Sequence, residues 1–192
     1  MPATRTDLDR DIKRGEVLDA AETLLLRDGY DDTTMAEVAR AAGVANNSVY
    51  WYFASKDELL AAVLRRRQER ALAEIADLAT SSLEGRVLAL LAQLDQVASL
   101  TAAVHERARH NTAVADMHQA FHATAERELG KGFRDAGLRP QEARRAAATI
   151  MAMIEGIHLH EKTRDPAARN RLILWTLHRL VAASADGAAS PP

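Results

Sequence analysis

The residues best suited to bind another molecule stand in one short stretch, 43–58, which reads GVANNSVYWYFASKDE. Small polar side chains come first, at Asn46, Asn47 and Ser48, and four consecutive aromatic residues follow at 50–53. The whole chain has 2 Trp, 3 Tyr and 3 Phe, so half of its aromatic residues stand here. Amide and hydroxyl groups can read base edges, and tyrosine hydroxyls can bind phosphate. The stretch therefore predicts a DNA-binding surface.

Two short helices are expected to position this stretch. Thr34 followed by Glu37 is a capping-box pattern, which starts a helix that ends at Ala42-Gly43. A further short helix is expected over about 45–53. Two short helices joined by a tight turn that contains glycine make a helix-turn-helix, in which the second helix reads DNA.

The rest of the chain also has helical periodicity, and alanine and leucine dominate its composition. We expect an all-α fold of about nine helices, with an N-terminal three-helix domain and a C-terminal helical domain for ligand binding and dimerisation. The expected boundaries are 1–54 for the helix-turn-helix domain, 55–185 for the C-terminal domain and 186–192 for a disordered tail. The other helices are expected over about 9–28, 55–79, 83–97, 101–110, 112–135, 140–164 and 166–183.

Composition excludes several classes of function. The chain has no Cys, which rules out disulfides, thiol catalysis and cysteine-ligated metal. It lacks a glycine-rich phosphate loop and a nucleophile elbow, so we expect no enzyme activity and no cofactor. No apolar run is long enough to span a membrane, and the N-terminus has no signal-peptide core, so a cytoplasmic protein is expected.

The charge of the chain does not by itself favour DNA. The formal net charge of the 192 residues is −2, and residues 1–70 hold 11 Lys and Arg against 13 Asp and Glu. Placement of charge must therefore matter more than its sum. Arg65, Arg66 and Arg67 with Arg70 form a basic run, which we interpret as a solvated helix face, with a role in DNA affinity as the alternative.

The seven histidines raise the question of a pocket or a metal site. His118 and His122 are four residues apart on one expected helix, a spacing that can hold a metal ion. His118 falls within the apolar stripe of that helix. We expect a ligand pocket rather than a metal site, with partly buried core histidines as the alternative; the residues assigned to it are Met117, His118, Phe121, His122, Met151 and Ile154.

The last two long helices have apolar residues on more than one side. A helix that is apolar on two sides must be covered on two sides, and small residues allow another helix to approach closely. We expect a two-fold dimer through a four-helix bundle, with complete coverage inside one chain as the alternative. The residues assigned to this interface are Ala148, Ala152, Gly156, Leu159, Ile173 and Leu177.

The segment from Val17 to Leu60 resembles the N-terminal DNA-binding domain of the TetR family of bacterial transcriptional regulators. The resemblance covers about a quarter of the chain. It is carried by Gly29-Tyr30, Thr33-Thr34, Val38-Ala39, Ala42-Gly43-Val44, Val49-Tyr50-x-Tyr52-Phe53 and Ser55-Lys56-Asp57-Glu58-Leu59-Leu60.

The resemblance implies a homodimer that binds a near-palindromic operator, usually as a repressor, and that is usually released by a small molecule. The Leu, Val, Met and Phe residues of the C-terminal helices predict that this effector is apolar or amphipathic. It places base-reading residues at 46–48 and phosphate contacts at Thr34, Tyr50, Tyr52 and Lys56. The full set of residues assigned to the DNA surface is Thr33, Thr34, Ala45, Asn46, Asn47, Ser48, Tyr50, Trp51, Tyr52 and Lys56.

Two positions depart from the family pattern. Ala45 stands where a small hydroxyl residue is frequent, so the usual cap of the reading helix is missing and Asn46 is a candidate to replace it. Asn47 stands where glycine is common, which implies a distinct operator. Two alternatives remain open: a regulator of the same fold switched by a protein partner or a metal, and a helical enzyme or metal-binding module.

Overall fold

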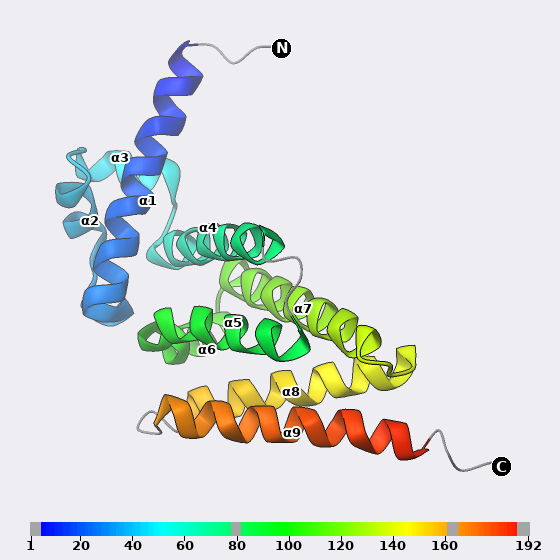
Figure 1. Cartoon of the computed structure of the whole chain (residues 1–192). Coiled ribbons are helices and arrows are strands. Elements are labelled where there is room, and N and C mark those ends of the chain that lie inside the picture. The colour runs from blue at the N-terminus through cyan, green and yellow to red at the C-terminus, as the bar shows by residue number, and fades with distance from the viewer. Residues whose placement is uncertain (1–4, 78–81, 161–164, 188–192) are drawn as a thin grey trace. The chain divides into compact units, whose positions relative to one another are not determined.

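The computed structural model describes residues 5–77, 82–160 and 165–187. These residues form nine α-helices and one 3-10 helix, without strands (Figure 1). The elements are α1 (Arg5–Asp32), α2 (Met35–Ala41), α3 (Asn46–Tyr52), α4 (Lys56–Asp77), α5 (Leu83–Gln96), η1 (Ala98–Leu100), α6 (Thr101–Ala108), α7 (Thr112–Asp135), α8 (Pro140–His160) and α9 (Pro166–Gly187).

The expected all-α class is confirmed, and α7 has the expected bounds. Helix α1 starts at Arg5, earlier than expected, and the 3-10 helix was not anticipated. The expected ends of α4 and α8, at residues 79 and 164, lie outside the described residues. The predicted tail begins at 186, but α9 continues to Gly187, and residues 188–192 lie outside the described part of the chain.

The chain divides into two compact units. The first comprises residues 1–70 and 99–118, and the second comprises 71–98 and 119–192. Helices α4 and α7 each run from one unit into the other. The unit that holds the helix-turn-helix thus includes α6 and parts of α4 and α7, so it is larger than the expected 1–54. The functional division at 54/55 remains a prediction.

In the first unit, one face of α1 supplies buried apolar side chains, which include Val17, Ala21 and Leu25. Gly29 then interrupts the helical dihedrals with φ 84° and ψ 176°. A positive φ is strained for a side chain with a Cβ, so glycine suits this break. The break directs Tyr30 into the interior, where its side chain is buried.

A buried carboxylate joins three segments of this unit. Asp57, in the first turn of α4, accepts a hydrogen bond from the Tyr30 hydroxyl. Arg107 of α6 binds the same carboxylate with two N–H groups, Nε to Oδ1 at 2.8 Å and Nη2 to Oδ2 at 2.7 Å. The hydrogen bonds from Arg107 hold the pKa of Asp57 below its usual value, although burial acts in the opposite direction. This arrangement fixes the turn after α1, the start of α4 and α6 together.

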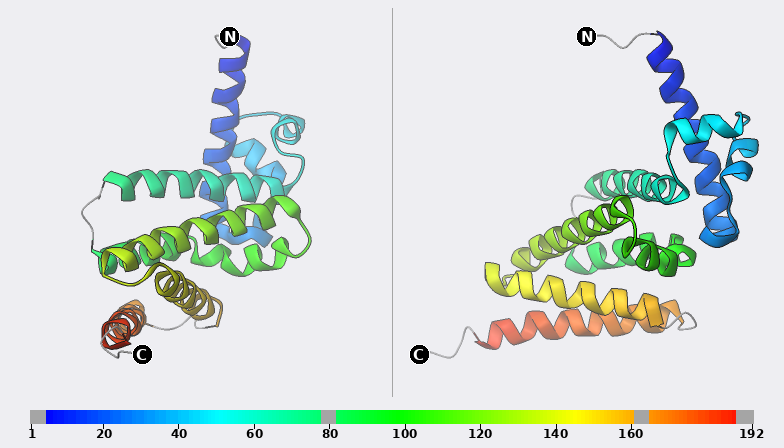
Figure 2. Two further views of the ribbon diagram at one scale, coloured as in Figure 1. Left: turned by 90° about the vertical axis from the view of Figure 1, so that its right-hand side faces the viewer. Right: turned by 180° about the vertical axis from the view of Figure 1, so that it is seen from behind.

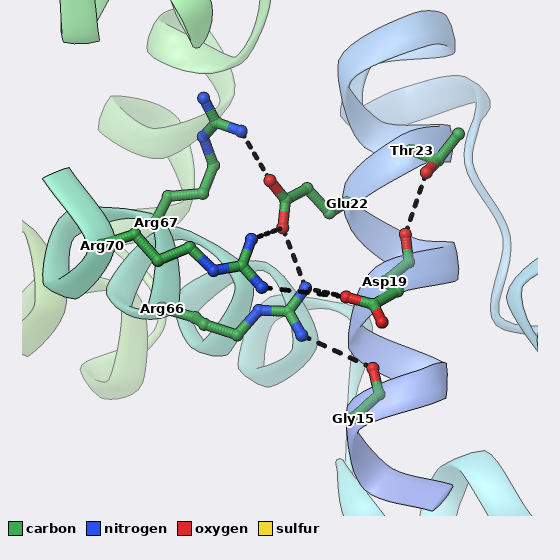
Figure 3. Close-up of polar contacts among 7 residues, drawn as sticks. All are labelled: Gly15, Asp19, Glu22, Thr23, Arg66, Arg67 and Arg70. Carbon is green, nitrogen blue, oxygen red and sulfur yellow. Dashed lines mark hydrogen bonds and ion pairs between the residues drawn. The ribbon is translucent and has the colours of Figure 1, made fainter. Parts of the chain in front are cut away.

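Three of the four arginines in the basic run of α4 are directed at α1 (Figure 3). Glu22 of α1 accepts hydrogen bonds from Arg66 at 2.8 Å, Arg67 at 2.5 Å and Arg70 at 3.2 Å. Burial raises the pKa of Glu22, but the hydrogen bonds from Arg66 and Arg67 outweigh it and the pKa lies below its usual value. The solvated-face interpretation holds for Arg65, which is exposed, and is wrong for Arg66 and Arg67.

The second unit is built on the packing of α8 against α9, which run antiparallel (Figures 1 and 2). Its core contains fully buried side chains from both helices and from α5 and α7, among them Leu91, Phe133, Ile150 and Ile173. Arg169 of α9 is buried and forms a two-pronged ion pair with Asp95 of α5, with Nη2 to Oδ2 at 2.8 Å. This pair ties α9 to α5 at the edge of the core.

Among the described residues, no single helix combines the length and apolar character needed to cross a membrane. The consecutive segments Leu83–Gln96 and Ala98–Ala108 meet that test by length and composition when they are counted together.

The buried carboxylate of Asp57 leads to a prediction about how the stability of the protein depends on pH. Asp57→Asn should lower the free energy of unfolding by about 1.5–3 kcal/mol, because charge-assisted hydrogen bonds to Arg107 are lost. A carboxylate whose pKa is depressed by folding stabilises the protein above the unfolded pKa of about 3.9 and loses that contribution as the pH falls through the folded pKa. The difference between wild type and variant should therefore shrink below about pH 4.

Chemical denaturation of the full chain as a function of pH measures this difference. Asp116→Asn is the matched control, because Asp116 is exposed on α7 and should change stability by less than about 0.5 kcal/mol. Equal stability of wild type and Asp57→Asn at pH 7 would contradict the assignment.

Candidate nucleic-acid interface

The turn between α2 and α3 is tightly determined by backbone hydrogen bonds. Gly43 has φ 65°, and its N–H donates to the carbonyl of Arg40 at 3.3 Å. The N–H of Val44 donates to the carbonyl of Ala39 at 3.0 Å. This pair of bonds is a Schellman motif, which ends a helix and requires a residue that tolerates positive φ. The expected helix-turn-helix is therefore present, and the turn fixes how α3 leaves α2.

The start of α2 is capped as expected. The hydroxyl of Thr34 accepts a hydrogen bond from the N–H of Glu37, and the Glu37 carboxylate accepts one from the N–H of Thr34. Thr34 remains exposed and keeps its predicted DNA role. The prediction that Thr33 belongs to the DNA surface is wrong. Thr33 is 1% exposed, and its hydroxyl donates to the carbonyl of Gly29 at 2.7 Å. A side chain buried in this way cannot contact DNA.

Helix α3 has one buried and one exposed side. Val49 is fully buried, and Phe53 directly after the helix is 3% exposed. Asn46 and Asn47 are exposed, and Ser48 is half-buried. Because residues four apart lie on the same helix face, the two asparagines share the outer side with the aromatic residues one turn later. The predicted base-reading side chains are thus brought to one accessible surface.

The aromatic residues divide between the two sides. Trp51 is 81% exposed and Tyr50 is 49% exposed, whereas Tyr52 is half-buried. Large aromatic side chains at such exposure are unusual for a monomer surface and mark a contact surface. The consecutive positions of Tyr50, Trp51 and Tyr52 predict that at least one of them projects outward, because three such residues cannot share one helix face, and this is confirmed. The prediction from the sequence that Val49 and Phe53 belong to the core is also confirmed.

Helix α3 starts without a side-chain cap. Ala45 occupies the N-cap position with an extended backbone, and no side chain accepts from the free N–H groups there. Asn46 is the first helical residue and does not replace the missing cap. A seven-residue helix without a cap is unstable alone, so α3 depends on the burial of Val49 and Phe53 for its conformation.

Lys56, predicted to bind phosphate, has another set of partners. Its Nζ donates to the carbonyls of Tyr30 at 2.8 Å and Thr33 at 3.0 Å, and lies 3.5 Å from that of Asp31. It also stands 4.1 Å from the centroid of the Tyr30 ring. All three ammonium donors are directed at the turn after α1. A phosphate contact would have to compete with these bonds, so the main role of Lys56 in this structure is to close that turn.

Ser55 followed by Glu58 is a second capping-box pattern in the sequence, and the start of α4 only partly matches it. The Ser55 hydroxyl accepts from the N–H of Glu58 at 3.2 Å, as expected. The Glu58 carboxylate instead accepts from the N–H of Ala54 at 3.1 Å, one residue earlier than the pattern predicts. The helix start is still fixed, and Asp57 is free to face the interior.

One basic residue near α3 received no site role from the sequence. Arg14 of α1 is exposed, and its guanidinium lies 5.1 Å from the centroid of the Phe53 ring at the end of α3. The two residues are far apart in the chain, so no spacing pattern could have joined them.

The residues predicted to bind a ligand differ in accessibility. In the first unit, Met117 is buried and His118 is half-buried. In the second unit, Phe121 and His122 are half-buried, but Met151 and Ile154 are 2% and 0% exposed within the core. The last two can therefore meet a ligand only if the core around them rearranges.

The histidines have different partners. His105 and His118 pack edge to face with ring centroids 4.7 Å apart, whereas the Nε2 of His122 lies 3.2 Å from a carboxylate oxygen of Glu155 on α8. His110 and His178 are exposed, and His158 is hydrogen-bonded to the carbonyl of Ile154.

The residues assigned to a dimer interface fall into two groups. On α8, Ala148 and Ala152 are exposed, and Gly156 and Leu159 are half-buried. On α9, Ile173 and Leu177 are 0% and 2% exposed in the core of their own unit, so their assignment to a partner surface is corrected. The exposed side of α9 instead carries Trp175, at 57% exposure, with the Arg179 guanidinium 5.5 Å from its ring centroid.

Comparison with known proteins identifies the first part of the chain. Residues 17–63 match the model of the bacterial regulatory proteins of the tetR family. The chain is 39% identical over 66 residues to the HTH-type transcriptional regulator SrpR of Pseudomonas putida, an alignment that covers 34% of this chain and 31% of SrpR. The segment 17–63 that matches the family model contains α2, α3 and the start of α4.

Two longer matches extend beyond that segment. The chain is 30% identical over 161 residues to the HTH-type transcriptional regulator BetI of Cronobacter sakazakii, covering 77% of this chain and 78% of BetI. The fold is similar to the crystal structure of a transcriptional regulator from Saccharomonospora viridis in complex with choline, with a TM-score of 0.71, 20% identity, and coverage of 86% of this chain and 95% of that one. The chain, with its helix-turn-helix and its exposed outer side of α3, belongs to the tetR family of DNA-binding transcriptional regulators.

Proposed function

We propose that this protein is a cytoplasmic repressor that binds a palindromic DNA operator as a homodimer and is released by a small organic effector. The observation that carries the DNA part is the outer surface of α3. Asn46, Asn47 and Tyr50 are exposed on it, while Val49 is fully buried behind it. A helix held in this way can enter a major groove, where asparagine pairs with adenine N6 and N7.

The proposal of a dimer is supported by the exposed sides of α8 and α9. A row of small residues on α8, at Ala148, Ala152 and Gly156, would allow a second helix to approach closely. A Cβ added to Gly156 would meet no atom within 4 Å, so packing inside the chain does not require glycine there. Trp175 adds a large exposed apolar side chain on α9. Two reading helices are needed because operator half-sites are spaced about 34 Å apart, beyond the reach of one.

The proposal of an effector is supported by half-buried polar groups among apolar ones on α7. His118 and His122 stand one turn apart on this helix, which also carries Phe121. A structure of the same fold is described in complex with choline, which shows that this fold can hold a small organic molecule. We propose a mostly apolar effector that bonds to at least one of these histidines.

Loss of either asparagine should change which DNA sequence is preferred. A good asparagine–adenine pair discriminates by about 1–3 kcal/mol, so Asn46→Ala or Asn47→Ala should relax preference at defined operator positions by about 5- to 150-fold. The measurement is binding of purified protein to sequences selected from a random library and to their single-base variants. Gln119→Ala, on the exposed side of α7, is the control and should leave the preference unchanged. A uniform loss on every sequence would show that these residues do not read bases.

Introducing negative charge on the exposed faces of α8 and α9 should dissociate the dimer. Ala152→Glu combined with Trp175→Glu should yield folded monomers with strongly reduced operator affinity, as judged by light scattering and DNA binding. Leu88→Glu is the matched control, because Leu88 is 38% exposed on α5, outside the proposed interface. A wild-type protein that is monomeric at micromolar concentration would refute the dimer.

An effector should weaken operator binding through differential affinity for two conformations. We expect a compound found by screening apolar and amphipathic molecules, choline included, to reduce operator affinity by about 5- to 150-fold. His118→Phe should keep DNA binding and lose this response, since it fills the same space without the imidazole hydrogen bond. A variant that responds like wild type would make His118 a packing residue.

A further inference from the structure

The reading helix of this protein carries no charge. Residues 46–52 read NNSVYWY, so α3 itself supplies no cation for phosphate. Most of the affinity of proteins for DNA comes from neutralised phosphates, which release bound counterions. A DNA-binding role for α3 therefore requires basic side chains from neighbouring segments.

Most basic side chains of the first unit already have acidic or carbonyl partners. The Lys13 ammonium lies 2.7 Å from Glu16, and Arg27 forms a two-pronged pair with Asp28. Arg66, Arg67 and Arg70 bind Glu22, and Arg107 binds Asp57. Arg40 stands near Glu37, whose pKa it helps to lower after the larger effect of the hydrogen bonds from Thr34. Because the side chains of these residues and of Lys56 are already bonded within the protein, they are less available to bind DNA phosphate.

Arg14 differs from them. It is exposed, and among the described residues it has no hydrogen-bonded or ion-paired carboxylate. Its guanidinium lies over the ring of Phe53, the residue that ends α3, at 5.1 Å from the ring centroid. An arginine held over an aromatic ring by a cation–π contact does not use its N–H groups on a carboxylate, and the contact restricts its side-chain freedom.

The first turns of α1 extend past α3, as Figures 1 and 2 show. Arg10 lies one turn before Arg14 and is also exposed. Tyr52 contributes, after the larger effects of Glu16, to raising the pKa of Lys13, which places this turn of α1 close to the end of α3. Residues 5–18 of α1 hold four basic and four acidic residues. The placement of Arg14, and not the net charge of this segment, therefore brings a cation to the side of the reading helix.

We propose that Arg14 is a phosphate-contacting residue of the DNA interface, held ready by the ring of Phe53. It binds the backbone beside the bases that α3 reads and supplies charge that α3 and Lys56 do not. This inference rests on the proposed DNA-binding function, and it adds α1 to the interface. Arg14 should contribute to affinity on every DNA sequence and not to the choice among sequences.

The test is the salt dependence of DNA binding. Arg14→Gln keeps much of the side-chain stem and removes the charge, so the slope of log affinity against log salt should become less steep by about 0.9 for each phosphate that is no longer neutralised. For a dimer in which each protomer uses Arg14 on one phosphate, affinity should fall about tenfold less between 50 and 200 mM salt than in wild type. Arg14→Lys should retain most of the slope, because the charge remains.

Arg65→Gln is the matched control, because Arg65 is an exposed arginine on α4, outside the helix-turn-helix. Its salt slope should equal that of wild type. Thermal unfolding of each variant separates a folding defect from a binding defect, since Arg14 also packs on Phe53.

The outcomes separate this inference from the function on which it rests. If wild type binds selected DNA and Arg14→Gln has an unchanged slope, Arg14 packs on Phe53 without contacting phosphate, and the inference is wrong. If Arg14→Gln alters the preferred sequence, Arg14 reads bases and the assignment to phosphate is wrong. If wild type binds no DNA sequence with measurable affinity, the proposed function itself fails.

Discussion

The carboxylate of Asp57 is the constraint on which the first unit depends. It is nearly buried, and a buried charge is tolerated only when its hydrogen-bonding capacity is satisfied. The Tyr30 hydroxyl and the Arg107 guanidinium supply these bonds from the segment after α1 and from α6. Asp57 lies in the first turn of α4, directly after the helix-turn-helix, so the same carboxylate helps to fix the chain where it leaves α3. Lys56 adds to this by closing the turn that carries Tyr30.

The conformation of α3 is supported from outside the helix. It has seven residues and no side-chain cap, which is too little for a stable helix in water. The Schellman turn before it and the buried Val49 and Phe53 compensate for this weakness. Its outer side is then free to carry asparagine and exposed tryptophan, residues that add little to folding. The inner side of this short helix therefore supports folding, and the opposite side is the one that we propose for recognition.

Charge is distributed in a way that explains how a chain of net charge −2 can act on DNA. Many arginines of the first unit form ion pairs that join helices, such as those with Glu22 (Figure 3). These pairs stabilise the unit and remove positive charge from its surface. Arg10 and Arg14 remain exposed at the start of α1. A small number of well-placed cations beside α3 can serve DNA binding when the sum of charges does not.

Local signals in the sequence were sufficient for the helix-turn-helix, the capping box at Thr34, the core role of Val49 and Phe53 and the bounds of α7. Each depends on neighbouring residues, through hydrogen bonds within a turn or the periodicity of one helix. Tertiary structure decided the partners of the long polar side chains. Lys56 bonds to carbonyls about 25 residues earlier, Arg66 and Arg67 bind α1, and Arg14 stacks on Phe53. It also decided that Ile173 and Leu177 face the core of their own unit. A periodic pattern shows that a helix has an apolar side, but only the packing of helices determines what covers it.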